Sequence, residues 1–233
     1  MVNKLIVESL DDQIFIEAIL RHYQNDAVAI EPPICHIDDF ECMRGLNDGK
    51  LSDALSNLKN QMVKNDIRKA GIIIDHDGRV QERLAQINKA VHAVFDVQKD
   101  FTAAGEFIGV STLIDGEVVN LELGCFLMGI GNRGELETVL RIIAKSPAPY
   151  ADCLVGWSDC VRPLIEKEPF KNKEFEKLWV DAYMRWDTCS SKERRQAGRK
   201  CSKRDFDSIL KKDIWDFDHA VLDDLKAFLS HFH

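Results

Sequence analysis

The sequence predicts an α/β fold, with a mostly parallel central sheet flanked by helices and a helical carboxyl-terminal part. Short β-branched runs alternate with amphipathic stretches of helical period up to about residue 148, and this alternation is typical of βαβ units. From Tyr150 onward the apolar residues follow helical spacing, without a convincing strand. We therefore expect an α/β domain over residues 1–148 and a helical extension over residues 149–233 packed on it.

Each expected element has a local reason. KLIVES predicts a first strand over residues 4–9, and AGIIIDHDG predicts a central strand over residues 70–78. Two adjacent prolines make residues 27–37 a bent, short or edge strand, and a DG turn predicts a hairpin over residues 105–129. Apolar residues at three- and four-residue intervals predict helices over residues 11–25, 46–67, 79–95, 133–146, 169–186, 192–217 and 219–232.

Composition narrows the class of protein. The first residues lack the apolar core of a signal peptide, and no apolar run reaches the roughly 18 residues that cross a bilayer. We therefore expect a cytoplasmic protein with no membrane partner. The seven cysteines form no CxxC pair, so we expect thiols in a reducing compartment, with a structural zinc site as the weaker alternative.

Three carboxylates are expected to meet at one edge of the sheet. Glu8 ends the first strand, and Asp75 and Asp77 end the GIII strand. The carboxyl ends of parallel strands lie on one sheet edge, and alternation along the strand would point Asp75 and Asp77 the same way. Mg²⁺, or Mn²⁺ in its place, would neutralise them through oxygen ligands. An Asp after a strand is also an ordinary turn or capping residue, so the DxD pair alone leaves that interpretation open.

Two of these stretches resemble motifs of the Toprim (topoisomerase–primase) domain superfamily. LIVESLDDQIF is similar to its first motif, a strand that delivers a Glu with an Asp four residues later, here Glu8 and Asp12. GIIIDHDG is similar to its second motif. GCFLMGIGNRGELETVL and DFDHAVLDDLKAFL resemble an uncharacterised bacterial branch, a domain of unknown function related to the overcoming-lysogenisation-defect nucleases. Ser9 stands where the superfamily usually has Gly, and Gly129 where the branch usually has Pro.

The resemblance implies a Toprim-like fold and phosphoryl transfer on nucleic acids. By the same resemblance, Glu8 is the general acid or base, or a metal ligand, and Asp75 and Asp77 hold magnesium. Asp12 holds the turn through backbone amides or helps to bind a second metal. Glu137 matches the Glu of a GxLE motif in the branch and is a second-metal candidate.

Several neighbouring residues keep two interpretations. Asp11 is a ligand or a helix cap, and Glu137 could simply complement the macrodipole of its helix. His76 lies between the two aspartates, where alternation points it away from them, and packing is its expected role. Arg79 and Arg133 bind phosphate near the metal or pair with acids.

Charge separates the two parts of the chain. Residues 151–233 carry equal numbers of basic and acidic side chains, so the net charge of −8 arises in residues 1–150. A basic stretch over residues 192–212 could follow a nucleic-acid backbone, although a helix this charged is usually just a solvated face. Few aromatic residues interleave it, so base stacking is not indicated. The candidate contacts are Arg194, Arg195, Arg199, Lys200, Lys203 and Arg204.

The first functional hypothesis is a magnesium-dependent enzyme that cleaves or transfers phosphodiester bonds in nucleic acid, similar to the Toprim nucleases. A second is a binding or regulatory module that kept the fold and lost turnover. A third is a phosphohydrolase that acts on small nucleotides, in which case the basic stretch is incidental.

Overall fold

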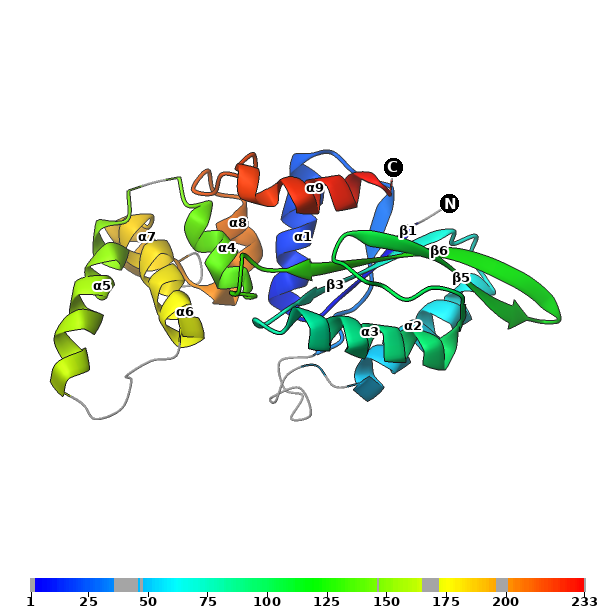
Figure 1. Ribbon diagram of the computed structural model, residues 1–233. Helices are drawn as coiled ribbons and strands as arrows, with labels where there is room; N and C mark the ends of the chain where they lie inside the picture. The colour runs from blue at the N-terminus through cyan, green and yellow to red at the C-terminus, as the bar shows by residue number, and fades with distance from the viewer. Residues whose placement is uncertain are drawn as a thin grey trace. The chain divides into compact units, whose positions relative to one another are not determined.

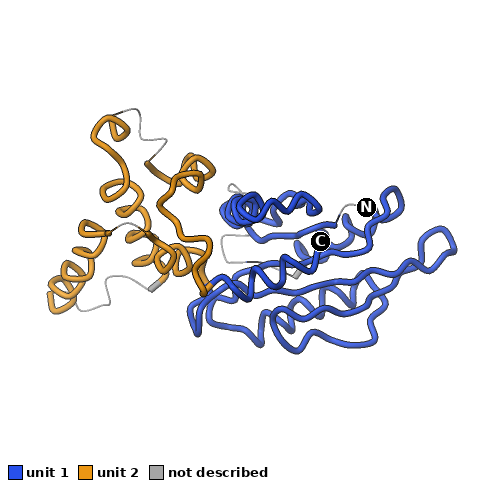
Figure 2. Tube along the Cα trace, turned by 90° about the horizontal axis from the view of Figure 1, so that it is seen from above, with its two compact units in different colours: residues 1–134, 222–233 blue, residues 135–221 orange. Residues whose placement is uncertain are grey.

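The computed structural model describes residues 3–35, 46, 48–145, 147–164, 172–195 and 201–232. The chain forms two compact units (Figure 2). Unit 1 comprises Met1–Gly134 together with Leu222–His233, and unit 2 comprises Glu135–Val221. This division differs from the expected boundary after residue 148 in two ways: the first break follows Gly134, and residues 222–233 return to unit 1.

Unit 1 is built on a mixed sheet of the α/β class that the sequence predicts. The described strands form one six-stranded sheet in the order β2-β1-β3-β6-β5-β4. Pairing is parallel from β2 through β6, and β5 and β4 continue antiparallel. The strands are β1 (Asn3–Val7), β2 (Val28–Ile30), β3 (Lys69–Asp75), β4 (Asp96–Val97), β5 (Glu106–Ile114) and β6 (Glu117–Met128).

Helices cover both faces of this sheet (Figure 1). α1 and α9 lie on one face, and α2 and α3 lie on the other. A short 3₁₀ helix, η6, precedes α9. The bounds are α1 (Leu10–His22), α2 (Asp48–Met62), α3 (Val80–Val94), η6 (Ala220–Leu222) and α9 (Asp223–Ser230).

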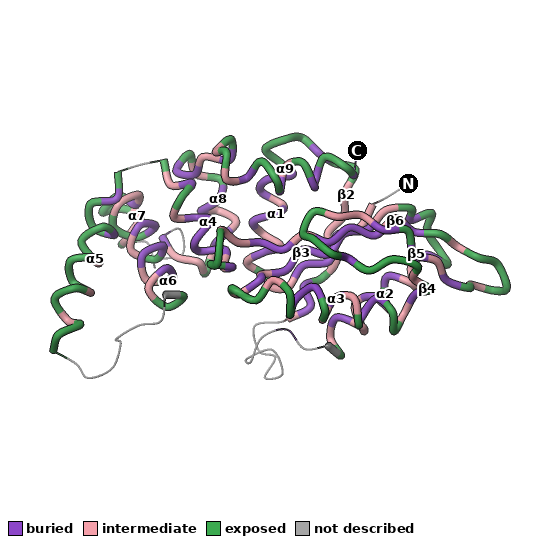
Figure 3. Tube along the Cα trace, viewed as in Figure 1, coloured by how far each residue is buried: buried purple, intermediate pink, exposed green. Residues whose placement is uncertain are grey.

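Alternate residues of β3 belong to the two faces of the sheet. Ile72 and Ile74 join a buried cluster with residues of α2 and α3, whereas Gly71 lies against Phe228 and Phe232 on the other face. Figure 3 shows the central strands buried along most of their length. The GIII run is therefore apolar throughout because a parallel strand in the middle of such a sheet has no solvated side.

Two paired glycines make room for α9. Gly71 of β3 is the register partner of Gly124 of β6. A Cβ atom at Gly71 would lie 2.8 Å from the ring of Phe232, and one at Gly124 would lie 2.8 Å from the ring of Phe228. The absence of side chains at both positions thus lets α9 approach the sheet, and we call this place the glycine slot.

The hairpin and the edge strand agree with the sequence predictions. Asp115 and Gly116 join β5 to β6 with φ of +53° and +87°, as a type I′ turn requires. β2 is a short edge strand of three residues before the two prolines. β4, which pairs with β5 over two residues, is an addition that the sequence did not predict.

Unit 2 is helical, and its described residues contain no strand. An isolated bridge joins Ala144 to Trp215. The short elements between the α-helices are 3₁₀-helical, apart from η3, which is a π-helix that continues α6. The bounds are α4 (Leu136–Ile142), α5 (Pro149–Val161), η2 (Arg162–Leu164), α6 (Asn172–Ala182), η3 (Tyr183–Asp187), α7 (Ser191–Arg195), η5 (Lys203–Asp205) and α8 (Phe206–Leu210).

Stacked aromatic rings form the centre of unit 2. Tyr183 stacks on Trp179 at 5.3 Å between ring centroids and meets Trp215 edge-on at the same distance. Its hydroxyl donates to the carbonyl of Ile214 at 2.9 Å. The guanidinium of Arg141 lies 5.2 Å from the Trp179 ring centroid and pairs with buried Glu176. Two of the four tryptophans, Trp179 and Trp215, thus belong to this core.

Two expectations about unit 2 are wrong. A single helix over residues 192–217 is not formed, because the described residues of that range divide among α7, η5 and α8. The cysteines are not all thiols, because a disulfide joins Cys189 to Cys201, and Cys35 in unit 1 is also disulfide-bonded. Cys125, Cys153 and Cys160 are free.

In the described part of the chain, no helix combines the length and the apolar character that a membrane span requires.

Candidate functional site

The carboxyl ends of β1 and β3 bring Glu8 and Asp75 to one edge of the sheet. Val7 pairs with Ile73 in parallel register, so Glu8 follows the end of one central strand while Asp75 ends its neighbour. Both residues are half-buried. One oxygen of each, Oε2 of Glu8 and Oδ1 of Asp75, is buried and accepts no hydrogen bond, although both residues take part in other interactions.

Asp12 joins the same edge from the first turn of α1. Ser9 and Asp12 form a capping box: the Ser9 side chain accepts from the Asp12 amide, and Asp12 Oδ2 accepts from the Ser9 amide at 2.9 Å. Burial, with a smaller contribution from the negative charge of Glu8, raises the pKa of Asp12 from 3.8 to about 7, against the hydrogen bonds from Ser9. Ser9, where the resembled motif has Gly, therefore starts α1 as an ordinary N-cap.

Asp77 lies in a turn after β3, so the expectation of strand alternation does not apply to it. The strand ends at Asp75, and Asp77 adopts a left-handed φ of +48°. Its Oδ2 atom accepts from Arg83 at 2.6 Å and lies 3.6 Å from a guanidinium nitrogen of Arg79. Asp77 is thus held by two arginines, and of the two interpretations of Arg79 the structure displays the pairing with acids.

Arg83 is a residue that sequence reasoning missed. Only 4% of its side chain is exposed, and it donates to Gln86 as well as to Asp77, while its Nε atom is buried without a hydrogen-bond partner. The available signal was its position, because Arg83 falls between Val80 and Ile87 on the apolar stripe of α3. A charge at a core position of a helix needs a buried partner, and Asp77 is that partner.

His76 packs, as its position between the aspartates suggests. It is buried, and its Nδ1 atom accepts from the Gly78 amide at 2.9 Å. Burial lowers its pKa, although the charge of Asp77 opposes this. A Cβ at Gly129 would lie 2.1 Å from His76 Nε2, and one at Gly134 would lie 2.5 Å from Nδ1. Gly129, which departs from the resembled branch, is thus the residue that accommodates this imidazole.

Two other candidate residues, Glu137 and Arg133, lie in local structure that the sequence did not predict. Glu137 belongs to unit 2, where its buried carboxylate accepts from Lys203 Nζ at 2.6 Å. Burial raises the pKa of Glu137, but the charge and hydrogen bond of Lys203 outweigh it and leave the pKa lowered. The pair also accounts for Lys203, which was expected to contact nucleic acid. Arg133 is exposed in a turn closed by backbone hydrogen bonds to Ile130.

The rest of the basic stretch divides into three groups. Arg195 and Arg204 are exposed, and Arg194 is half-buried. Lys211 and Lys212 pair with Asp207 and Glu193. Arg199 and Lys200 lie outside the described residues.

The carboxylate edge fits a hard divalent cation in donor type. Its candidate ligands are carboxylate oxygens on two neighbouring strand ends and the helix that follows one of them. The described residues hold no group of three His, Cys, Asp or Glu side chains placed to bind a metal. Mg²⁺ commonly uses one or two carboxylates and keeps several waters, so two carboxylates are within the number that this ion uses in proteins. A hollow of about 850 Å³ lies elsewhere, at the Asn120 end of β6.

Comparisons with known proteins assign a family. No curated protein and no solved structure matches the chain. A family model described as "Protein of unknown function (DUF3226)" matches residues 2–233. Because that match covers nearly the whole chain, the protein belongs to the DUF3226 family.

Proposed function

We propose that this protein is a magnesium-dependent enzyme that transfers phosphoryl groups of nucleic acid, in the manner of the Toprim nucleases that its first two motifs resemble. The observation that carries the proposal is the placement of Glu8 and Asp75 at the carboxyl ends of adjacent parallel strands. In an open α/β sheet, ligands gather outside the carboxyl ends of the strands. Asp12 and Asp77 follow the same two strands in the chain, Asp12 with its raised pKa and Asp77 paired with Arg83.

Glu8 and Asp75 would hold the cation through carboxylate oxygens. A bound Mg²⁺ would supply positive charge to the phosphoryl oxygens during the transfer. Asp77 is kept in its turn by Arg83 and stands beside the ligands as a positioning residue. Arg79, which is half exposed at the start of α3, is available to an incoming phosphate if it exchanges its contact with Asp77.

Glu8 is also proposed to move the proton, through the carboxylate oxygen that does not bind the cation. It lies directly after β1, and the Ser9–Asp12 capping box fixes the backbone that follows it. A carboxylate on so rigid a support can be held within hydrogen-bond reach of a reacting oxygen, as general acid–base catalysis requires.

The proposal is tested by metal binding and cleavage measured separately. Titration with Mn²⁺, followed by electron paramagnetic resonance, reports the ion without any substrate. Asp75→Asn is expected to weaken Mn²⁺ binding and abolish magnesium-dependent cleavage of labelled DNA and RNA. Glu8→Gln is expected to lower the cleavage rate by about 100-fold or more.

The matched control is Glu117→Gln, at an exposed glutamate of the hairpin, which should bind Mn²⁺ and cleave as the wild type does. Absence of Mn²⁺ binding by the wild-type protein, or unchanged cleavage by Asp75→Asn, would contradict the proposal.

A second candidate is a binding module without turnover. The observation in its favour is the pairing of Asp77 with buried Arg83, which occupies one carboxylate of the DxD pair. A wild-type protein that binds Mn²⁺ through Asp75 and cleaves neither DNA, RNA nor nucleotides would support this candidate. Cleavage of small nucleotides alone would instead indicate a phosphohydrolase.

A further inference from the structure

Unit 2 presents an exposed aromatic pair with two arginines over it. Trp186 is 48% exposed and Tyr150 is 62% exposed, and their ring centroids lie 6.4 Å apart. The guanidinium of Arg194 lies 5.1 Å from the Trp186 ring centroid, and that of Arg185 lies 5.6 Å from it. We call these four residues the Trp186 patch.

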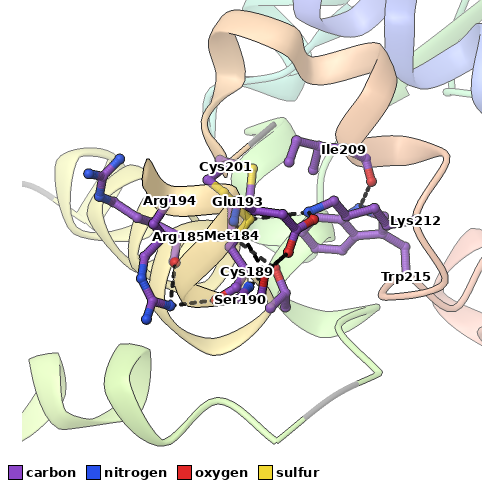
Figure 4. Close-up of polar contacts among 11 residues, drawn as sticks. Met184, Arg185, Cys189, Ser190, Glu193, Arg194, Cys201, Ile209, Lys212 and Trp215 are labelled. Carbon is purple, nitrogen blue, oxygen red and sulfur yellow. Dashed lines mark hydrogen bonds and ion pairs between the residues drawn. A yellow bond between two sulfur atoms is a disulfide. The ribbon is translucent and has the colours of Figure 1, made fainter. Parts of the chain in front are cut away.

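The backbone around the patch holds these side chains in place. Arg185 and Trp186 lie in the π-helix η3, which the Thr188 amide closes by donating to Tyr183 O at 3.1 Å. π-helical turns are rare in proteins, and those that occur are often found at functional sites. Figure 4 shows the Arg194 guanidinium directed at backbone carbonyl oxygens, with those of Cys189 and Arg185 as acceptors. Since Cys189 is bonded to Cys201, the disulfide fixes the acceptor that orients Arg194.

Two acids close to the patch in sequence, Asp187 and Glu193, hydrogen-bond to groups outside it. The Asp187 carboxylate accepts from the amides of Tyr150 and Ala151 at 2.9 and 3.0 Å, at the start of α5. The Glu193 carboxylate accepts from Ser190 and pairs with Lys212 at 3.1 Å (Figure 4). Both carboxylates are therefore engaged by other groups, while Lys192 and Arg195 add exposed positive charge nearby.

The short helix α7 concentrates basic residues beside the patch. It carries Lys192, Arg194 and Arg195 and one acid, Glu193. Base stacking was not expected from the basic stretch, because few aromatic residues lie within it. The fold instead brings Trp186 from the preceding helix to Arg194, so aromatic surface and positive charge share one place.

We propose that the Trp186 patch binds an unpaired strand of nucleic acid, with bases stacked on Trp186 and Tyr150 and phosphates met by the surrounding arginines and lysines. Single strands expose the faces of their bases, and sites for them combine aromatic platforms with a basic surface. A duplex hides those faces. The inference takes nucleic acid as the ligand class from the proposed function, and it adds the strand state and a binding site in unit 2.

The test is fluorescence anisotropy of the full-length protein with a labelled oligothymidylate of about 20 nucleotides, long enough to cover one site. EDTA is present so that no metal-dependent cleavage occurs. Trp186→Ala is expected to weaken binding about tenfold, because stacking on one aromatic ring contributes on that order. Trp186→Phe should retain most of the affinity, and Tyr150→Ala should lose part of it.

Matched controls come from the same unit. Trp157→Ala removes another exposed tryptophan, and Arg162→Ala removes an exposed arginine near the end of α5. Both should bind as the wild type does. Circular dichroism of each variant confirms that it is folded, and Tyr150→Ala, whose side chain is largely exposed, tests the site if Trp186→Ala does not fold.

Three outcomes would overturn the inference: no binding of the oligonucleotide, unchanged affinity in folded Trp186→Ala and Tyr150→Ala, or equal affinity for a duplex of the same length. The proposed function fails separately. A protein that binds the strand in EDTA but never cleaves with magnesium leaves the Trp186 patch intact and removes the catalyst. If the wild type cleaves but Trp186→Ala binds the strand normally, the proposed catalyst stands and the Trp186 patch is not the binding site.

Discussion

Units 1 and 2 place their polar groups by different means. In unit 1 the carboxylates follow the ends of buried strands, so backbone pairing between β1 and β3 determines where Glu8 and Asp75 lie. In unit 2 the arginines and the exposed rings are placed by side-chain contacts, a π-helical turn and a disulfide. The comparison teaches that a strand end can be located from local sequence, whereas a site made of side-chain contacts depends on residues far apart in the chain.

The largest expected effect tests the dependence of unit 1 on its sheet packing. Phe228→Ala removes one of the rings that lie at the glycine slot and should lower the free energy of unfolding by about 3–5 kcal/mol, because loss of a buried aromatic ring leaves a cavity. Urea unfolding followed by far-ultraviolet circular dichroism measures it. Val118→Ala, on the exposed hairpin, is the control and should change stability by less than about 0.5 kcal/mol. A loss no larger than the control's would mean that α9 does not hold the sheet.

The next effect concerns the disulfide of unit 2. Replacing Cys189 and Cys201 together by Ser should cost about 3 kcal/mol, as expected for a closed loop of this length. All four tryptophans lie in unit 2, so their fluorescence during urea unfolding reports on that unit. The matched pair Cys153→Ser and Cys160→Ser alters free, exposed thiols and should leave the transition in place. Coincident curves for the two double variants would show that the disulfide adds no stability.

A somewhat smaller effect is expected at the ion pair of unit 2. Lys203→Met leaves the buried Glu137 carboxylate without its cation and should cost about 2 kcal/mol, less than for a fully buried pair because Lys203 is partly exposed. Adding Glu137→Leu removes the stranded charge and should recover most of the loss. Thermal unfolding of both variants at neutral pH measures the difference. If the double variant is the less stable of the two, the pair itself, rather than the burial of an unpaired charge, controls this position.

The last effect is a pH dependence in unit 1, which is smaller than the others when it is expressed per pH unit. The pKa of Asp12 is about 7 in the folded protein against an ordinary value of 3.8. Between these values the folded state keeps a proton that the unfolded state has lost, so Asp12 makes the protein less stable as pH rises through this window. The contribution is level above about pH 7 and amounts to at most about 1.4 kcal/mol per pH unit.

Asp12→Asn isolates this contribution, because the side chain no longer titrates. Unfolding in EDTA from pH 4 to 8 should give a stability difference between wild type and variant that changes across the window and then stays constant. A difference independent of pH would show that Asp12 is ionised throughout the range.

Much of unit 1 was predictable because its signals are local. The GIII strand, the DG hairpin and the two-proline edge strand depend on neighbouring residues, and each is confirmed. The edge shared by Glu8 and Asp75 followed from the handedness of parallel connections. The alternation argument for Asp77 was wrong because the strand ends two residues before it, and a left-handed turn replaces the pleat.

Unit 2 was less predictable because its determinants are long-range. Helical spacing predicted the helices but not where they break. Lys203 and Arg194 are compatible with a continuous helix, and their partners, Glu137 and the Cys189 carbonyl, are brought to them by the fold. The disulfide could not be deduced from cysteine spacing. Likewise, nothing in the order of residues indicated that Trp186 lies over Arg194.

The return of residues 222–233 to unit 1 has a consequence for the order of synthesis. The glycine slot between β3 and β6 is made by residues 71 and 124, but Phe228 and Phe232, which lie against it, are translated only after all of unit 2. When residues 1–134 of the nascent chain have left the ribosome, one face of their sheet is therefore still incomplete. Folding of unit 1 cannot finish during its own translation, and any chain cut short within unit 2 exposes an apolar groove that quality-control proteases and chaperones recognise.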